Sequence, residues 1–444
     1  MMADNAVSNA ALVDVAVKDP QNHGEGRNKY TSYLVEVKSP SNSACRRRYS
    51  DFQWLYEKLL EERAGCIVPI IKHTRALRAN FRFSEELISQ RSLHLTCFLE
   101  RVMQHPDLID APSLKMFLTA DYTVWEALKK SNGIDDAALD DLALTSESDD
   151  VSGVKPPPES PTTGGAGRIS NWMNKIRTKV ALAAKNTQLH STPDDDIFND
   201  IDAYINNLDS NIKILHKGSE TLIKSMKQSS ETMQQMSASF AEMGQYKLPN
   251  DIVVRTPSHT MLSKLGINWN NLSKLGSFQE SSAAKKLEAP LDEMVRDVQA
   301  VKIAMTKRRE LLYNYSRKIS VANTKEGQLD KLREAGSTPD FKSSALEEEI
   351  SSLKNEGKEL WSELESVSRR LSRDIERFKQ EFREKMRATM ESFHTIQKEY
   401  AEKFTLGWAE VLPILKPPEA SINAPPQEAF SGPGKDDEPI TTAI

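Results

Sequence analysis

The chain has 444 residues, which is room for two or three domains. Hydrophobic residues make up 38% and charged residues 28%, a polar composition that is typical of long, solvated helices and argues against a wholly globular chain. The formal net charge of -5 excludes a protein that coats nucleic acid, because such proteins need a basic excess to displace phosphate counterions. Any recognition of an anion must therefore be local.

The cysteines and the apolar runs indicate the compartment. Cys45, Cys66 and Cys97 are odd in number and widely spaced, which suits neither a disulfide framework nor a zinc site, so we expect a reducing environment. We find no run of roughly 20 apolar residues that could span a bilayer and no signal peptide in the first residues. We expect a cytoplasmic protein whose contact with membranes is peripheral.

Residues 11–123 predict an α+β domain. Segments 11–20 and 29–39 alternate apolar and polar residues as strands do, with QNHGEGRN as a hairpin loop between them. We expect a third strand at Cys45–Tyr49, which gives a three-stranded antiparallel sheet. Helical spacing of apolar residues follows from Phe52, and again in residues 84–105 and 112–121.

The stretch RRRYSDF, residues 46–52, sets three cations beside an aromatic ring. From the residues alone it is compatible with an anion site, a nucleic-acid patch or a solvated edge. The net charge of the chain disfavours the second of these.

Two segments join the first domain to the rest. Residues 124–167 are rich in Asp, Ser, Gly and Pro and predict a linker, as residues 1–10 and 416–444 predict disordered ends. Residues 168–187 predict an amphipathic helix, with cations flanking an apolar stripe, as in interfacial membrane helices. Packing on another domain is the alternative for this helix. The stripe contains Ile169, Trp172, Met173, Ile176 and Val180.

Residues 194–415 predict an all-α domain of three long helices. Apolar residues recur at steps of three and four from 194 to about 243, from Gln279 to Ala335 and from Phe341 to Leu412. A seam of that length requires partner helices, so we expect a long three-helix coiled coil that dimerises. Pro290 should kink the middle helix, and Tyr246–Ser263 reads as a loop.

Both regions resemble a known family. RRRYSDFQWLYEKL, Pro69, FRFSEELISQR and HPDLIDAPSLKMFLT resemble a phosphoinositide-binding PX domain. EAPLDEMVRDVQAVKIAMTKR and DIERFKQEFREKM resemble the BAR domain of sorting nexins. The chain as a whole resembles a PX-BAR sorting nexin of the kind that works with retromer.

The resemblance implies a lipid site. By this resemblance, Arg48 binds the 3-phosphate, Tyr49 packs on the inositol ring and Arg91 contacts the inositol hydroxyls. The family's proline-rich loop ends in a lysine that meets the 1-phosphate, but here the segment is IVPIIKHTRALRANFRF. Lys72 is the nearest lysine, but it lies earlier in the loop than the family's lysine does. His73, Arg75 and Arg78 are therefore alternative candidates for the contact with the 1-phosphate. Arg46 and Arg47 read as charges on the strand edge.

For the second domain the resemblance implies a homodimer or heterodimer with a basic face toward the membrane. The candidate contacts are Arg308, Arg309, Arg317, Lys318, Lys331 and Arg333. A further basic stripe, Arg369, Arg370, Arg373 and Arg377, is interleaved with acidic residues. Charged runs on long helices are also common as plain solvated faces.

These features predict a protein without enzymatic activity on the cytosolic face of endosomes. We expect it to bind phosphatidylinositol 3-phosphate or a 3,5-bisphosphate and to sense or induce membrane curvature as a dimer. We also expect a role in retromer-linked sorting, with the retromer core as a possible partner. We find no nucleotide-binding, metalloprotease or CxxC motif, and expect no cofactor, metal or nucleic-acid partner. The alternatives are a nexin of the autophagy and recycling group, or a coiled-coil adaptor whose first domain binds protein.

Overall fold

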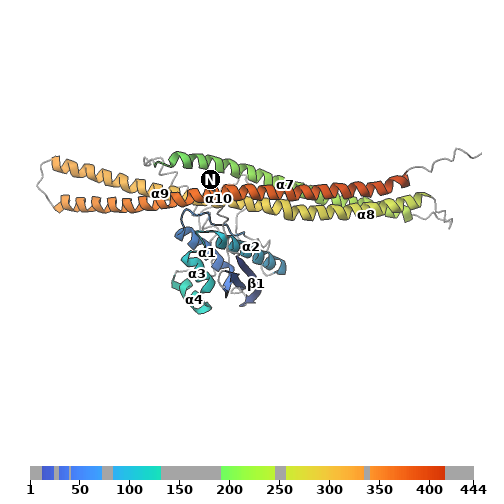
Figure 1. Cartoon of the computed structure of the whole chain (residues 1–444), viewed down its shortest axis with the longest axis horizontal. Coiled ribbons are helices and arrows are strands. Elements are labelled where there is room, and N and C mark those ends of the chain that lie inside the picture. Colours follow the sequence, from blue (N-terminus) through green and yellow to red (C-terminus); the bar gives the residue numbers. More distant parts are fainter. Residues whose placement is uncertain are drawn as a thin grey trace, which may run out of the picture. The chain divides into compact units, whose positions relative to one another are not determined.

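The computed structural model describes residues 13–24, 30–39, 42–72, 84–131, 192–245, 257–334 and 341–415. The described residues form two compact units, one within residues 1–222 and 283–393 and the other within residues 223–282 and 394–444. The first unit contains the whole α+β domain and the adjoining parts of the long helices. Figure 1 labels the elements.

The α+β domain is built on an antiparallel sheet in the order β1-β2-β3, as predicted. Its strands are β1 (Asp14–His23), β2 (Tyr30–Ser39) and β3 (Ser43–Arg48). β1 runs through the residues expected to start the hairpin loop, because it resumes pairing with β2 after an irregularity between Lys18 and Gln21. Asp19 lies in that bulge with a φ of 48°.

The helices of this domain are α1 (Tyr49–Glu62), α2 (Glu85–Gln104), α3 (Pro112–Thr119) and α4 (Tyr122–Ser131). Tyr49 is the first residue of α1 rather than the last of β3. The linker was predicted to begin at residue 124, which is wrong for its first part: α4 continues the domain to Ser131. Trp125 explains this, since it is fully buried against Trp54 and Phe117.

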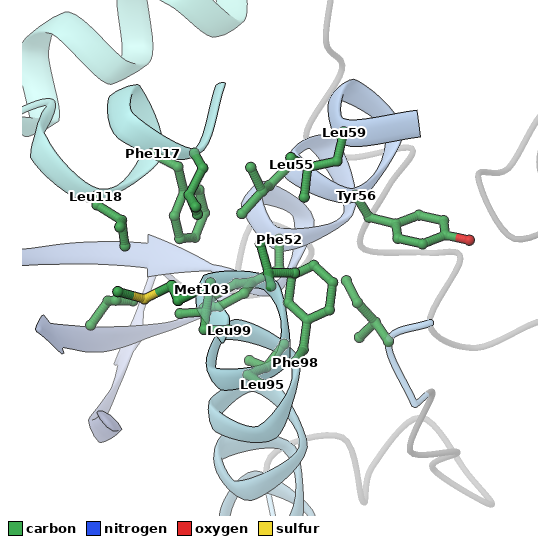
Figure 2. Packing of buried hydrophobic residues seen from close by; sticks show 14 of the residues in the cluster. Phe52, Leu55, Tyr56, Leu59, Leu95, Phe98, Leu99, Met103, Phe117 and Leu118 are labelled. Atoms are coloured by element: carbon green, nitrogen blue, oxygen red, sulfur yellow. The ribbon is translucent and has the colours of Figure 1, made fainter. Parts of the chain in front are cut away.

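The core of the domain lies between the sheet and the helices. Phe52, Leu55 and Leu59 from α1 meet Leu95, Phe98 and Leu99 from α2, all nearly inaccessible to solvent. Figure 2 shows these side chains converging with Phe117 and Leu118 of α3. Their helical spacing, read from the sequence, is the reason that each helix has one face to bury here.

The second region consists of α7 (Asp195–Gln245), α8 (Pro257–Ala283), a π-helical turn at Ala284–Glu288, α9 (Ala289–Glu334) and α10 (Phe341–Leu415). The predicted middle helix starts too late and the predicted loop ends too late, because α8 already begins at Pro257. Proline is favoured at the first position of a helix, where its missing N–H costs nothing. The serines, asparagines and glycines of α8 hid its helical character from the sequence pattern.

Pro290 lies just after the π-helical turn. The Ala289 N–H donates to the carbonyl of Ala284, five residues back. A wider turn accommodates a proline that can neither donate a hydrogen bond nor tolerate a regular preceding turn. The predicted kink of the middle helix at Pro290 stays a prediction, and the feature that the structure shows there is this π-helical turn.

In the first unit, α7, α9 and α10 bury a common apolar core. Phe198, Ile205 and Ile212 of α7 contribute to it, together with residues of α9 and α10 at regular helical spacing. The α9 and α10 residues include Leu291, Met294, Val298, Val301, Leu371 and Ile375. The predicted long seam is thus occupied by three helices of one chain.

In the second unit α7 and α8 approach closely at small residues. Ser230 and Ser273 exchange hydrogen bonds with each other's carbonyls at 2.7 and 2.9 Å. Ser237 donates to the carbonyl of Gly266 at 2.7 Å. Trp269 of α8 packs edge-on against Trp408 of α10, with ring centroids 5.0 Å apart.

Candidate functional site

The three arginines of RRRYSDF have different environments, because successive side chains of β3 point to opposite faces of the sheet. Arg46 forms an ion pair with Asp19 in the bulge of β1 and is partly exposed, which matches the predicted strand-edge charge. Arg47 does not: it is 1% exposed. Its guanidinium donates to the carbonyls of Phe117 and Ala120 and stacks on Trp125 at 4.4 Å. Arg47 is therefore a structural cation that fastens β3 to α3 and α4.

Arg48 lies at the junction of β3 and α1. Its guanidinium carbon lies 3.5 Å from the ring centroid of Tyr30, and its Nη2 is 3.8 Å from a carboxylate oxygen of Glu126 in α4. Its backbone N–H donates to Asp51 at 2.7 Å, which fixes the start of α1. The side chain is 16% exposed. The sequence pattern missed Tyr30 and Glu126, because both are far from the motif along the chain.

Tyr49 and Arg91 come together from α1 and α2. The guanidinium carbon of Arg91 lies 5.4 Å from the centroid of the Tyr49 ring, and both residues are almost fully buried. Burial raises the pKa of Tyr49 far above its usual value, partly offset by the charge of Arg91, so the phenol stays protonated at neutral pH. Of the three residues assigned to the ring and phosphate, Tyr49 and Arg91 are thus in contact, whereas the Arg48 guanidinium lies against Tyr30 and Glu126.

Lys72 lies apart from this cluster. Its ammonium forms an ion pair with Asp292 of α9 at 2.6 Å. A lysine held this closely must give up a carboxylate before it can meet a phosphate. The competing His73, Arg75 and Arg78 lie outside the described residues, as do the apolar residues of the predicted helix at 168–187.

The predicted cationic contacts of the second region also differ from one another. Arg308 is 4% exposed, stacks on Phe198 at 3.8 Å and donates to Ser368, Thr192 and Asp195. A guanidinium with these contacts holds α9 to α10 and the start of α7, so its placement contradicts the expected membrane contact. The reason is that Arg308 falls on the inward face of α9.

The remaining members of that set lie nearer the surface. Arg309 pairs with Asp202 at 2.7 Å, Arg333 with Glu347 at 2.8 Å and Lys318 with Glu356. Arg317 and Lys331 are exposed. Exposed pairs of this kind are worth little energy, so these cations can exchange a carboxylate for a phosphate at small cost.

The α+β domain and the long helices of the first unit meet at the turn after α1. Gly65 has a φ of +92°, and a Cβ there would lie 2.6 Å from the carbonyl oxygen of Val367 in α10. Ala64 packs with Leu364 and Leu311 beside it. The Ile67 N–H donates to Asp374 of α10 at 2.8 Å. Only glycine allows this approach of the two backbones.

A buried Cys66, His105 and Asp374 stand close enough to be considered as metal ligands. His105 Nδ1 accepts from the N–H groups of Asp107 and Leu108, which leaves Nε2 to donate to Asp374 at 2.9 Å. Burial, with the charges of Asp374 and Asp107, raises the pKa of the Cys66 thiol to about 12. A protonated thiol and a hydrogen-bonded His–Asp pair suit an anchor between domains better than a metal centre.

Comparison with known proteins agrees with this architecture. The family model for the PX domain matches residues 35–121, and the model described as Vps5 C terminal like matches residues 173–409, more than half of the chain. The chain belongs to the PX-BAR sorting nexins. This makes it a membrane-associated protein of endosomal sorting.

Individual relatives match over different lengths. Sorting nexin 1 of Arabidopsis thaliana is 24% identical over 436 residues, which are 94% of this chain and 96% of the relative. Vacuolar protein sorting-associated protein vps5 of Schizosaccharomyces pombe is 35% identical over 114 residues, 24% of this chain and 19% of that protein. The cryo-EM structure of the SNX-BAR Mvp1 tetramer has a TM-score of 0.49 and 14% identity, covering 90% of this chain and 99% of that one.

Among the described helices of this nexin, none is long and apolar enough to cross a bilayer.

Proposed function

We propose that this nexin binds phosphatidylinositol 3-phosphate through Arg48, Tyr49 and Arg91, with no enzymatic activity of its own. The observation that carries the proposal is the contact of the Arg91 guanidinium with the Tyr49 ring at the first turn of α1, where Arg48 is the residue before Tyr49. Arg91 comes from a distant place in the sequence, and the three side chains supply the two features that a phosphoinositide headgroup needs. These are forked cationic donors for the phosphate and an aromatic ring for the C–H face of inositol.

The chemistry fits an acidic protein. A guanidinium offers two parallel N–H donors to a phosphate, and charge-assisted bonds of this kind are worth about 1.5–3 kcal/mol each. The Arg48 guanidinium is held by the Tyr30 ring, which fixes its plane before the lipid arrives. Pre-ordering reduces the entropy lost on binding. The lipid is thus read at one pocket, so the net charge of the chain does not oppose it.

We further propose that the protein acts as a BAR dimer on curved endosomal membranes, in sorting linked to retromer. The likeness to Sorting nexin 1 over almost the full length of both chains, and the match to the Vps5 C terminal like family, support this assignment. Paired domains in one dimer multiply the effective concentration of each weak membrane contact. Binding of the purified retromer core to the full chain, measured by calorimetry, tests the link directly.

The lipid assignment is tested by flotation with vesicles that contain phosphatidylinositol 3-phosphate. Arg48→Gln and Arg91→Gln should each weaken binding to the vesicles by about tenfold or more, because each removes a charge-assisted contact. The bound fraction should fall accordingly. Arg46→Gln is the matched control, since this neighbouring cation pairs with Asp19 and should leave binding unchanged.

Equal binding of the wild-type chain to vesicles without phosphoinositide would contradict the lipid assignment.

A further inference from the structure

A cavity of about 850 Å³ lies within the first unit, away from the Arg48, Tyr49 and Arg91 cluster. It is bounded by the end of α1, the start of α7 and one face of α10. The volume lies in the range of ordinary ligand pockets and far exceeds that of a single phosphate. Four arginines line the cavity: Arg63, Arg369, Arg370 and Arg373.

Three of these arginines lack a carboxylate partner among the described residues. Arg63 donates from Nη2 to the carbonyl of Asp110 at 3.0 Å, while its Nε is buried and makes no hydrogen bond with the described residues. Arg370 donates to the hydroxyl of Ser366 at 3.0 Å. Arg369 reaches only the carbonyl of Glu365 in its own helix, at 3.5 Å.

Other arginines of the same unit show how unusual this is. Arg101 lies 2.7 Å from a carboxylate oxygen of Asp297, Arg377 lies 3.2 Å from Asp374, and Arg308 lies 3.1 Å from Asp195. Within the described part of the chain, Arg373 is the one cavity arginine with such a neighbour, Asp107 at 3.5 Å, and its side chain is 68% exposed. Two aspartates, Asp107 and Asp194, line the cavity against four guanidinium groups, so the site is cationic.

We propose that this cavity binds a multiply phosphorylated inositol ring, at a site separate from that of the proposed function. Arginine forks recognise phosphate oxygens in pairs, and several forks around one cavity require several phosphates at once. The hydroxyls of Ser366 and Ser372 in the lining can donate to further phosphate oxygens. The same chemistry is available from a soluble inositol polyphosphate and from the headgroup of a lipid bisphosphate.

The position of the site gives the ligand a structural consequence. Arg63 belongs to the turn after α1, and the other three arginines belong to α10. An anion held by both sides therefore joins the PX domain to the long helices, next to the close approach at Gly65. Because it binds the folded state, it raises the temperature of unfolding.

The test is titration calorimetry of inositol hexakisphosphate into the full chain that carries Arg48→Gln, which removes the proposed headgroup site. We expect saturable binding, with a rise in the unfolding temperature. Adding Arg369→Gln and Arg370→Gln should weaken this binding by about tenfold or more, because two charge-assisted contacts are lost. Both positions face solvent at least in part, so the chain should still fold.

Arg387→Gln is the matched control, because this exposed arginine of α10 pairs with Glu391 outside the cavity. Equal weakening by Arg387→Gln, or no saturable binding in the Arg48→Gln chain, overturns the proposal. Vesicles with a few mole per cent of phosphatidylinositol 3,5-bisphosphate distinguish the sources. If these vesicles recruit the Arg48→Gln chain, and the recruitment is lost with Arg369→Gln and Arg370→Gln, the ligand is a lipid. If the chain binds the soluble anion but not the vesicles, the ligand is soluble. Neither outcome depends on whether Arg48 reads phosphatidylinositol 3-phosphate.

Discussion

Adjacent arginines in RRRYSDF perform different physical tasks. Arg46 makes a surface ion pair. Arg47 is buried and donates hydrogen bonds to the carbonyls of Phe117 and Ala120. Arg48 lies at the candidate lipid site. Alternation along a strand separates the first two, and the start of α1 positions the third. Charge density alone therefore does not indicate which arginine meets an anion.

Replacing Arg47 by lysine should destabilise the protein by about 2–3 kcal/mol. An ammonium cannot reach the carbonyls of Phe117 and Ala120 together, and it leaves a buried acceptor without a donor. Arg46→Lys is the matched control and should change stability by less than about 0.5 kcal/mol, as exposed substitutions do. Urea unfolding of the two full-length variants measures the difference. Similar midpoints for both would refute the structural role of Arg47.

At the scale of elements, the turn after α1 sets how the PX domain meets α10. Gly65 allows its backbone to approach that of Val367, the Ile67 N–H donates to Asp374, and His105 donates to the same carboxylate. Lys72 and Arg101 add ion pairs to α9. These contacts join residues that are more than 190 positions apart in the chain.

Gly65→Ala should cost at least about 1–2 kcal/mol, because a Cβ at φ +92° is strained and also meets the Val367 carbonyl. Gly218→Ala in α7 is the matched control. It has open space around the new methyl group and should gain up to about 1 kcal/mol of helix propensity. Thermal unfolding compares the two, and hydrogen exchange at residues 63–67 should rise only in Gly65→Ala. Unchanged exchange there would argue against a tight junction.

Asp374 should make the same junction sensitive to acid. Burial acts to raise its pKa, but the hydrogen bond from His105, the Ile67 N–H and the charge of Arg377 outweigh burial and hold the pKa below the ordinary value. Because the folded state favours the ionised carboxyl, this contribution is complete above the unfolded pKa of about 3.9 and is lost as pH falls through the lowered folded value.

Asp374→Asn should therefore lower stability at pH 7 and flatten the loss of stability on going from about pH 5 to pH 3. Urea midpoints across that range measure the slope. Asp110→Asn, at an exposed carboxylate that pairs with Lys115, should keep the wild-type slope. A slope in Asp374→Asn as steep as that of the wild type would show that the junction does not titrate through this residue.

At the scale of the whole molecule, the proposed function combines several weak membrane contacts in one assembly. In this proposal the PX domain would supply a lipid-specific contact, and the exposed cations of α9 would supply contacts without lipid specificity. Linked contacts bind far more tightly together than apart, provided that the geometry of the membrane allows them to engage simultaneously.

The full chain should consequently bind small vesicles with phosphatidylinositol 3-phosphate more tightly than large vesicles of the same composition, when compared at equal accessible lipid. Sedimentation of both vesicle sizes measures this. Arg48→Gln should lower binding to both, and raising the salt concentration should weaken the contacts from exposed cations first. Equal affinity of the wild-type chain for both sizes would contradict curvature sensing while leaving lipid recognition intact.

Most of the strands and helices, and the motif, could be read from the sequence. Period-two alternation placed the strands, steps of three and four placed α1, α2, α7 and α10, and RRRYSDF with Arg91 marked the residues that the structure brings together. Such patterns are local, because a strand or a helix has one face to bury whatever covers it. The pattern failed at α8, where polar composition outweighed the few buried residues such as Leu272, and at α4, a short helix whose burial depends on Trp125.

The surroundings of each charged side chain, in contrast, became known from the folded structure. It turned Arg47 and Arg308 inward, paired Lys72 with Asp292, and gathered Arg63 with three arginines of α10 around one cavity. The physical reason is that a charge acts through its nearest neighbours, and in a folded chain those neighbours come from distant positions in the sequence.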